Sequence, residues 1–352
     1  MSAASQPSPR PVSALAECLP ALALAPSDVP ALLAAEAFSR TQLRAAQARL
    51  ELLARQDREL DAHAWAATAT FAFGSLGRLE ASAQSDLDLA LIYDGARLDP
   101  EVAERVRARV VAALADDFDI PQKTFDHAVD LRRLTRNIGG RDDSNETLTY
   151  RALLLTEGAW LAGSGRATKH AVFRAYTDAP ISRGRFLTSL GNDLHRYYRT
   201  LCMDYRYKVD ELDKSWAIRV LKLRHSRKLW HLANLALACW AVDAIDDDDA
   251  REVALASRIG WPSLLRLHVT LEHFGAAALG RELFLGFDRF LAALAEAPIR
   301  AELVALAYER RLDSPSYVAL HENAARIDLA AEAVVELLFA RCRGFFTRFC
   351  LL

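Results

Sequence analysis

The sequence lacks the features of a secreted, disulfide-bonded or membrane-bound protein. Its cysteines are scattered, with no C-x-x-C pair among Cys18, Cys202, Cys239, Cys342 and Cys350. This spacing argues against a zinc ribbon or a disulfide framework and fits a reducing cytoplasm. The chain has no run of eighteen apolar residues and no basic start followed by an apolar core. We therefore expect no membrane partner and predict a cytoplasmic location.

Neither sign of charge dominates, because 44 Lys and Arg residues and 46 Asp and Glu residues give a formal net charge of −2. The surface as a whole should not attract nucleic acid, so nucleic acid is not an expected partner, although a local basic cleft is compatible with this balance. The chain also shows no convincing fixed-period repeat. Its 352 residues exceed the usual size of one compact domain, so we expect two.

Hydrophobic periodicity divides the chain into a mixed first half and a helical second half. Residues 1–28 mix Ser, Ala and Pro and predict a loosely ordered lead-in. Helical and strand-like spacing then alternates. The predicted order is one long helix or two short ones over 31–61, a strand over 66–74, a short helix over 76–84, a strand over 87–93, a helix over 100–116 and a strand over 123–131.

Beyond Asn145 the apolar spacing is helical almost throughout. The predicted helices cover 146–162, 183–207, 215–242, 261–278, 281–295, 299–312 and 329–346. The fold class is therefore α+β, with a small mixed-sheet core over 29–165 and a larger all-helical domain over 166–352.

Two acidic residues stand out at the start of the predicted strand 87–93. Asp86 and Asp88 are two residues apart, which directs both carboxylates to one face at a backbone separation of about 7 Å. That arrangement suits magnesium, which prefers carboxylate oxygens together with substrate phosphates. Leu87, Leu89 and Leu91 would point to the opposite face and anchor the strand.

A glycine turn ends the strand that precedes this pair. Gly74 allows the backbone to approach a ligand closely, and Ser75 with the amides after it could donate hydrogen bonds to phosphate oxygens. Ten residues separate Ser75 from Asp86, enough for a short helix that returns the chain to the neighbouring strand. The two turns therefore predict a site for a triphosphate and its metal ions.

These runs resemble the polymerase-β-like nucleotidyltransferase superfamily, in which a hydrophobic residue and Gly-Ser precede D-x-D. The segments Phe73–Glu80 and Ser85–Leu89 are most similar to the branch of the PII-protein uridylyltransferases and glutamine synthetase adenylyltransferases. Val129–Arg132 resembles a V-D-L-R strand of the adenylyltransferases, and Leu155–Gly163 resembles the helix with an Ala-Gly turn that follows it. The resemblance covers about residues 60–165.

The resemblance implies roles for individual residues. Asp86, Asp88 and Asp130 would be catalytic metal ligands for Mg²⁺, or for Mn²⁺ in its place, with Asp126 as the alternative third carboxylate. The nucleotide-binding residues would be Gly74, Ser75, Arg78, Ser85 and Lys222. The reaction would be attack of a hydroxyl on the α-phosphate of a nucleoside triphosphate, with release of pyrophosphate.

Several features have more than one interpretation. Arg78 and Glu80 could form an ion pair or contact ligand, and Arg219 or Lys222 could neutralise a triphosphate or belong to a solvated helix face. Arg224 and His231 match the loose Arg-x4-6-His pattern of HEPN ribonucleases, although chance explains the match as well. Asp246–Asp249 is expected to be a solvated loop rather than a calcium site, and the aromatic cluster Phe345, Phe346 and Phe349 a packing or oligomer contact.

The leading interpretation is a metal-dependent transferase that moves AMP or UMP to a hydroxyl of a protein or a small molecule. Synthesis of a nucleotide second messenger and antibiotic nucleotidylation would use the same carboxylates with another acceptor pocket. The alternative outside catalysis is a silent, antitoxin-like module that binds nucleotide or protein on the same fold. Convergence of Asp86, Asp88 and a third acid in one open cleft would favour catalysis.

Overall fold

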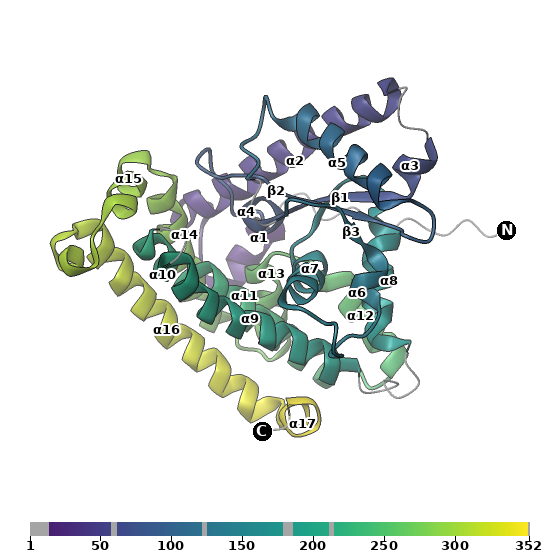
Figure 1. Cartoon of the computed structure of the whole chain (residues 1–352). Coiled ribbons are helices and arrows are strands. Elements are labelled where there is room, and N and C mark those ends of the chain that lie inside the picture. The colour runs from purple at the N-terminus through teal and green to yellow at the C-terminus, as the bar shows by residue number, and fades with distance from the viewer. Residues whose placement is uncertain (1–13, 58–61, 122–124, 179–185, 211–214, 351–352) are drawn as a thin grey trace.

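The computed structural model describes residues 14–57, 62–121, 125–178, 186–210 and 215–350 (Figure 1). The first part of the chain contains α1 (Ala14–Cys18), η1 (Leu19–Leu22), η2 (Pro26–Asp28), α2 (Pro30–Gln56), α3 (Ala62–Ala66), β1 (Thr68–Phe73), α4 (Gly74–Gly77), β2 (Asp88–Tyr93), α5 (Pro100–Leu114), β3 (Val129–Asp130), α6 (Leu131–Thr135), α7 (Asn145–Thr156) and β4 (Ala159–Gly163). The second part contains α8 (Gly165–Thr177), α9 (Phe186–Asp210), α10 (Trp216–Lys222), η4 (Leu223–Arg227), α11 (Lys228–Ala244), α12 (Asp248–Arg258), α13 (Ser263–His273), η5 (Ala277–Gly280), α14 (Arg281–Ala295), α15 (Ala297–Ala305), η6 (Tyr308–Asp313), α16 (Pro315–Arg341), α17 (Arg343–Phe345) and η7 (Phe346–Cys350).

The strands of the described residues form one mixed sheet in the order β3-β2-β1-β4. Strand β1 is antiparallel to both β2 and β4, whereas β2 and β3 are parallel. The α+β fold with a small mixed sheet and a larger helical part is therefore confirmed. The register pairs Phe73 at the end of β1 with Asp88 at the start of β2. The glycine turn and the D-x-D segment therefore meet where these two central strands end, which is called the sheet edge below.

Alternation along β2 separates its two faces, as the sequence predicts. Leu89 and Leu91 belong to the apolar cluster that α2 and α5 complete, and Leu87 just before the strand belongs to it too. Ala90 and Ile92 belong to the cluster on the opposite face, to which α7 contributes. In Figure 1 the sheet accordingly lies between α2 and α5 on one side and α7 on the other. Asp88 is two residues before Ala90, so its side chain lies on the same face of the sheet as Ala90, the face that α7 covers.

The helical half packs against the core as well as against itself. Helices α11 and α13 pair, α14 pairs with α16, and α14 also contacts α2. The carboxylate of Asp288 on α14 accepts a hydrogen bond from the backbone N–H of Leu32 on α2 at 2.8 Å. Helix α16 runs along one side of the molecule (Figure 1). None of the described helices combines the length and apolar character that crossing a membrane requires.

The N-terminal lead-in is more ordered than its proline content suggests. Residues 1–13 lie outside the described part, but the chain from Ala14 to Asp28 forms α1, η1 and η2. Leu15, Leu19 and Leu22 are buried in the core because they recur at helical spacing. The expectation of a loosely ordered 1–28 is therefore wrong for residues 14–28.

Three predicted elements differ in the structure: one changes type in part, and two are shorter than expected. The helix expected over 146–162 ends at Thr156, and residues 159–163 instead form β4 at the edge of the sheet, paired with β1. The strand expected over 123–131 is reduced to Val129–Asp130 within the described residues, since 122–124 are not described and 125–128 are irregular. The short helix expected over 76–84 covers only Gly74–Gly77, and an irregular loop leads from there to β2.

Helix ends follow local capping signals that the periodicity does not show. Helix α16 begins at Pro315, fourteen residues before the predicted start at 329, because Ser314 caps it by accepting a hydrogen bond from the N–H of Tyr317 at 3.1 Å. The acidic run 246–249 also forms a helix start, where Asp247 caps α12 through the N–H of Ala250 at 2.8 Å. All five cysteines are free thiols, as their spacing predicts.

Candidate active site

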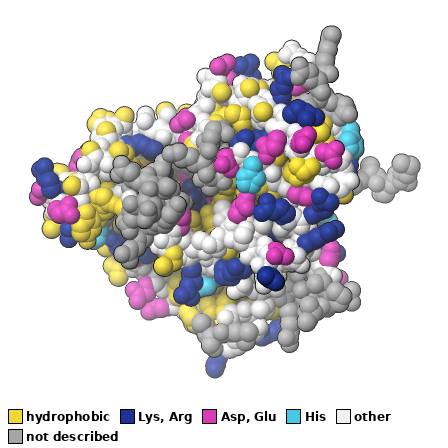
Figure 2. Space-filling view, in the orientation of Figure 1, with side chains coloured by type: hydrophobic (Ala, Val, Ile, Leu, Met, Phe, Trp, Pro, Cys, Tyr) yellow, Lys and Arg dark blue, Asp and Glu magenta, His cyan; other side chains and the backbone are white. Residues whose placement is uncertain are grey.

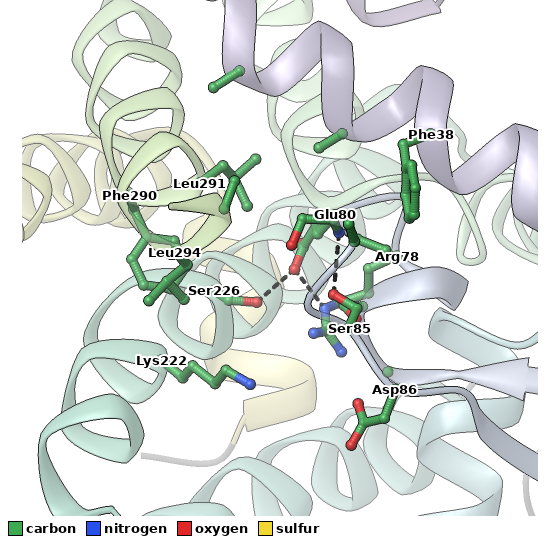
Figure 3. A pocket seen from close by; sticks show the side chains of 18 of the residues that line it. Phe38, Arg78, Glu80, Ser85, Asp86, Lys222, Ser226, Phe290, Leu291 and Leu294 are labelled. Carbon is green, nitrogen blue, oxygen red and sulfur yellow. Dashed lines mark hydrogen bonds and ion pairs between the residues drawn. The ribbon is translucent and has the colours of Figure 1, made fainter. Parts of the chain in front are cut away.

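A cleft with a volume of about 310 Å³ opens between the sheet edge and the helical half (Figure 3). Its lining comes from the N-terminal part of α2, the loop between β1 and β2, the end of α10 with η4, the end of α14, and α15. The residues are Ala31, Ala34, Ala35, Phe38, Gly74, Ser75, Arg78, Glu80, Ala81, Ser82, Ala83, Ser85, Asp86, Asp88, Lys222, Ser226, Arg227, Phe290, Leu291, Leu294, Ala295 and Arg300.

The cleft brings together most of the residues that the sequence singles out. These are Gly74, Ser75, Arg78, Ser85, Asp86, Asp88 and Lys222. They come from segments more than 130 residues apart in the chain, so their meeting is a property of the tertiary structure. Their individual roles stay predictions.

Asp130 does not lie in this cleft. Strands β2 and β3 are parallel, and the register places Asp130 beside Tyr93 at the far end of β2. Tyr93 is five positions beyond Asp88, which corresponds to about 17 Å along a strand. The Asp130 carboxylate instead pairs with Arg132 at 2.6 Å and caps α6 through the N–H of Arg132 at 2.9 Å. The expectation that Asp130 joins the D-x-D pair is therefore corrected.

Asp126, the alternative third carboxylate, is also outside the cleft. It is exposed, lies in the irregular segment before β3, and accepts a hydrogen bond from His127 at 2.9 Å. The described residues contain no cluster of three His, Cys, Asp or Glu side chains arranged to hold a metal ion. The cleft therefore supplies two carboxylates, Asp86 and Asp88, to a cation.

The Asp86 and Asp88 carboxylates have no hydrogen-bond or ion-pair partner among the described residues. Burial, and then the neighbouring charge of Asp86, raise the pKa of Asp88 to about 6. Asp88 is half-buried and Asp86 beside it is exposed, and a half-buried carboxylate next to a second acid is costly unless a ligand uses the charge. Because Mg²⁺ is commonly held by one or two carboxylates with substrate phosphates and water completing its shell, this pair fits such an ion.

The backbone at Gly74 fixes the distance between the glycine turn and the acids. Gly74 has φ of +67°, and a Cβ added there would lie 2.1 Å from Oδ2 of Asp88. A side chain is therefore excluded twice, by the left-handed backbone and by the carboxylate. The Gly74 backbone and the Asp88 carboxylate therefore lie side by side at the mouth of the turn.

Replacing Gly74 by Ala should therefore displace Asp88 as well as strain the backbone. We expect Gly74→Ala to lose metal-dependent nucleotide binding by at least about 10-fold, which is about 1.4 kcal/mol. Gly139→Ala is the matched control, because Gly139 also has positive φ, +73°, but no atom lies within 4 Å of its added Cβ. Titration calorimetry and thermal melting separate the two effects; equal binding losses in both variants would contradict a specific contact with Asp88.

A buried network of ion pairs and hydrogen bonds supports the glycine turn, and its central residue is Glu157. This fully buried carboxylate accepts hydrogen bonds from the Gly74 N–H at 3.0 Å and from Nη1 of Arg78 at 2.8 Å. Arg78 also pairs with Glu80 at 2.8 Å. Burial opposes the charge of Arg78, but the Glu157 and Glu80 carboxylates hold its pKa above the ordinary value. The ion-pair interpretation of Arg78 and Glu80 is therefore confirmed.

The helical half joins the same network through η4, a π-helical turn. In such a turn residues five apart come onto one face, and Lys222, Ser226 and Arg227 all line the cleft. Ser226 donates a hydrogen bond to Glu80 at 2.7 Å, as Figure 3 shows, and Arg227 lies 3.4 Å from Glu157. Core and helical half are thus tied together at the cleft.

Two cations face the cleft without an anionic partner among the described residues, Lys222 from α10 and Arg300 from α15. In Figure 3 the Lys222 side chain points across the cleft toward Asp86. Burial among the cleft walls lowers the pKa of Lys222, and Arg300 acts in the same direction. Because Lys222 stays open to solvent, water screens this effect. Two cations beside two acids suit a metal-bound polyanion.

Sequence reasoning missed Glu157, Ser226, Arg227 and Arg300. Glu157 was visible as a lone acid in the apolar run 152–161, where an isolated charge needs a partner. The others depend on how α10, η4 and α15 pack, which no local pattern shows. Arg219, the alternative to Lys222 on the basic helix, does not line the cleft.

The remaining motifs have structural roles. Arg224 pairs with Asp328 at 2.7 Å, whereas His231 stacks on Tyr198, so the HEPN-like spacing does not create a shared site. The C-terminal aromatic cluster is buried and its rings contact one another, with Phe345 and Phe346 centroids 5.3 Å apart. Packing therefore accounts for this cluster.

Comparison with known proteins agrees with the geometry. Residues 23–124 match the protein family described as Putative nucleotidyltransferase DUF294. No curated protein matches the chain. The matched region includes the glycine turn, both cleft acids and helix α2, and it does not distinguish the uridylyltransferase from the adenylyltransferase branch. Residues 23–124 are therefore similar to the DUF294 family of putative nucleotidyltransferase domains, which is consistent with a polymerase-β-like nucleotidyltransferase.

Proposed function

We propose that this protein transfers a nucleoside monophosphate from a nucleoside triphosphate to a hydroxyl of a protein or small-molecule acceptor, with release of pyrophosphate. The observation that carries the proposal is the meeting of Gly74, Asp86, Asp88 and Lys222 in one cleft. Carboxylates, a glycine turn and unpaired cations are the groups that a metal-bound triphosphate requires. The helical half, which forms the other side of the cleft, would select the acceptor.

Asp86 and Asp88 would hold Mg²⁺, or Mn²⁺ in its place. When bound, the ion would neutralise charge on the triphosphate and on the leaving pyrophosphate. Gly74, Ser75 and Ser85 would orient phosphate oxygens at the turn. Lys222 and Arg300 would balance negative charge on the opposite wall, where charge develops as pyrophosphate leaves.

No third carboxylate of the described residues joins the pair, and this favours a second candidate: a regulatory module that binds nucleotide without transferring it. Catalysis needs a group that accepts the proton of the attacking hydroxyl. Glu157 is nearby but is already engaged with Arg78 and Gly74. Transfer by this cleft would therefore pass the proton of the attacking hydroxyl to a phosphate oxygen of the bound triphosphate or to a separate basic group of the acceptor. The two candidates differ in whether product forms.

The experiment incubates the purified protein with labelled ATP, UTP, GTP or CTP, Mg²⁺ or Mn²⁺, and a lysate of its own host. Wild type should form a labelled product, and the size of that product would show whether the acceptor is a protein or a small molecule. The Asp86→Ala, Asp88→Ala double variant should form none. Nucleotide binding without product, for all four nucleotides and both metals, would establish the silent module instead.

The proposed role of Lys222 can be tested separately. Lys222→Met keeps the length of the side chain but removes the charge, and we expect the dissociation constant for Mg-nucleotide to rise about 10-fold or more. Lys228→Met, on the following helix, is the control because Lys228 pairs with Asp328 and does not line the cleft. Equal effects of the two substitutions in binding assays at several salt concentrations would argue against a phosphate contact.

The charge distribution on one face of the molecule bears on the kind of acceptor. On the face shown in Figure 2, Lys and Arg side chains are interspersed with Asp and Glu side chains among the described residues. A continuous basic surface, which would draw a polynucleotide acceptor, is not visible on that face. This supports an acceptor recognised by local contacts at the cleft.

A further inference from the structure

One part of the cleft is lined by apolar side chains from α2 and α14, two helices distant in sequence that face each other there. This apolar lining is called the wall below. On α2 the lining residues follow the i, i+3, i+4, i+7 spacing of one helix face. They are Ala31, Ala34, Ala35 and Phe38. On α14, Leu291 and Leu294 line the same cleft, and Figure 3 shows them on the opposite side from Phe38. The alanines and the flat Phe38 ring of α2 therefore face branched leucine side chains of α14, and small side chains beside a flat ring leave room for a planar group.

This wall adjoins the polar end of the cleft. In Figure 3 Lys222 and Asp86 lie at one end, whereas Phe38 and Leu291 lie at the other. The Glu80 carboxylate, held by Arg78 and Ser226, lies between them. A ligand whose phosphates contact Asp86 and Lys222 would therefore extend its uncharged end toward α2 and α14.

Two hydrogen bonds fix α2 relative to the rest of the cleft. Its N-terminal turn is held to α14 by the bond from Leu32 N–H to Asp288 at 2.8 Å. About two helical turns farther along, Ser39 Oγ accepts the N–H of Ala81, in the loop between the glycine turn and the acids, at 3.0 Å. These two bonds fix the position of α2 relative to α14 and to the loop that joins the glycine turn to Asp86.

Planar rings with apolar faces suit such a wall. Ligand sites are typically apolar with a few polar groups, and their volumes begin at about 300 Å³. A nucleobase stacks on aromatic and apolar side chains whatever its edge carries. A bicyclic purine covers more apolar surface than a monocyclic pyrimidine and so gains more from burial.

Resting on the proposed transfer reaction, we infer that the wall formed by α2 and α14 binds the base of the donor nucleotide and selects a purine. The Phe38 side chain contacts the base by its face or by its edge, and the alanines of α2 set the width of the space for the base. Selection follows from the stacked area, so purine triphosphates bind about 10-fold more tightly than pyrimidine triphosphates.

The test measures equilibrium binding of the α,β-methylene analogues of ATP, GTP, CTP and UTP, and of inorganic triphosphate, all with Mg²⁺. Ala34→Leu fills the proposed base site. Ala37→Leu is the matched control, since Ala37 is also exposed on α2 but does not line the cleft. Ala34→Leu should weaken purine binding at least about 10-fold and leave inorganic triphosphate unchanged. Phe38→Ala should weaken purine binding at least about 5-fold.

Each outcome has a distinct meaning. If inorganic triphosphate binds but pyrimidines bind as tightly as purines, or Ala34→Leu leaves purine binding unchanged, the base site is overturned while the phosphate site stands. If inorganic triphosphate and all four analogues fail to bind, the proposed function fails, and the base site with it. Thermal melting of Ala34→Leu and Ala37→Leu shows that both variants are folded.

Discussion

Replacing both cleft acids, Asp86→Asn with Asp88→Asn, is expected to lower the rate of nucleotidyl transfer by at least about 10³-fold. The change keeps the size of both side chains but removes the charges that would hold the metal ion, whose contribution to phosphoryl chemistry is several kcal/mol. Initial rates of pyrophosphate release measure the loss. Nucleotide binding without metal should change little, because Lys222 and Arg300 are untouched.

Asp130→Asn is the informative control for this pair. Sequence resemblance makes Asp130 a third metal ligand, whereas the structure places it at the other end of β2, paired with Arg132. We expect its transfer rate to stay within about 3-fold of wild type, with a loss of stability of about 1 kcal/mol from the weakened cap of α6. A 10³-fold loss of rate in Asp130→Asn would contradict the placement of the site.

Asp88→Asn alone should also stabilise the metal-free protein at neutral pH. The pKa of Asp88 is raised from 3.8 to about 6 in the folded state. The stability that protonated Asp88 contributes is therefore present below pH 4 and is lost as pH rises through 6. Above that pH the variant should be more stable by on the order of 2 kcal/mol, and added Mg-nucleotide should narrow the difference. Urea unfolding between pH 4 and pH 8 measures it.

The second large effect is expected for Glu157→Ala. This substitution leaves Arg78 with only Glu80, weakens the setting of Arg227 and leaves the Gly74 N–H without its acceptor. Removing one partner of a buried ion pair typically costs about 3–5 kcal/mol. We therefore expect the free energy of unfolding to fall by about that amount, and nucleotide binding to fall with it because the glycine turn loses its support.

Glu146→Ala is the matched control, since Glu146 pairs with Arg133 and His127 at a position 36% exposed. An exposed pair contributes at most about 1 kcal/mol. Urea unfolding of both variants gives the comparison. Similar losses for Glu157→Ala and Glu146→Ala would show that the buried network does not stabilise the site as described.

The part of the site that follows from local sequence could be predicted. Gly74 needs a left-handed backbone, and two acids spaced by one residue at the start of an apolar strand need a ligand, so both signals lie within fifteen residues. Alternation along the strand likewise predicts that Leu87, Leu89 and Leu91 lie on the face of β2 opposite to the two acids. These features depend on backbone geometry and alternation, which a sequence displays directly.

The position of Asp130 could not be predicted from local sequence in this way. Whether Asp130 meets Asp88 depends on the direction and register in which β3 pairs with β2, and β3 has only two residues to specify them. Strand β4 was missed because Ala159–Gly163 is a short apolar run, for which helical and strand periodicity are hard to distinguish. Pairing with β1 decides its structure.

The contributions of distant helices were equally hidden. The alanine face of α2 appears in sequence only as an amphipathic helix, and its partner on α14 lies about 250 residues later. The π-helical turn that presents Ser226 and Arg227 arises within a segment whose composition is ordinary for a helix. The residues proposed to bind the triphosphate and its metal ion can therefore be predicted from the sequence. The surfaces proposed to select the base and the acceptor depend on how distant helices pack.

The most direct test of the central claim compares ATP labelled at the α-phosphate with ATP labelled at the γ-phosphate, under the conditions that give product. Nucleotidyl transfer predicts that only the α-label enters the acceptor, that the γ-label leaves in pyrophosphate, and that the Asp86→Asn, Asp88→Asn variant transfers neither. Entry of the γ-label into the acceptor, or α-label transfer undiminished in the double variant, would contradict the assignment of this cleft.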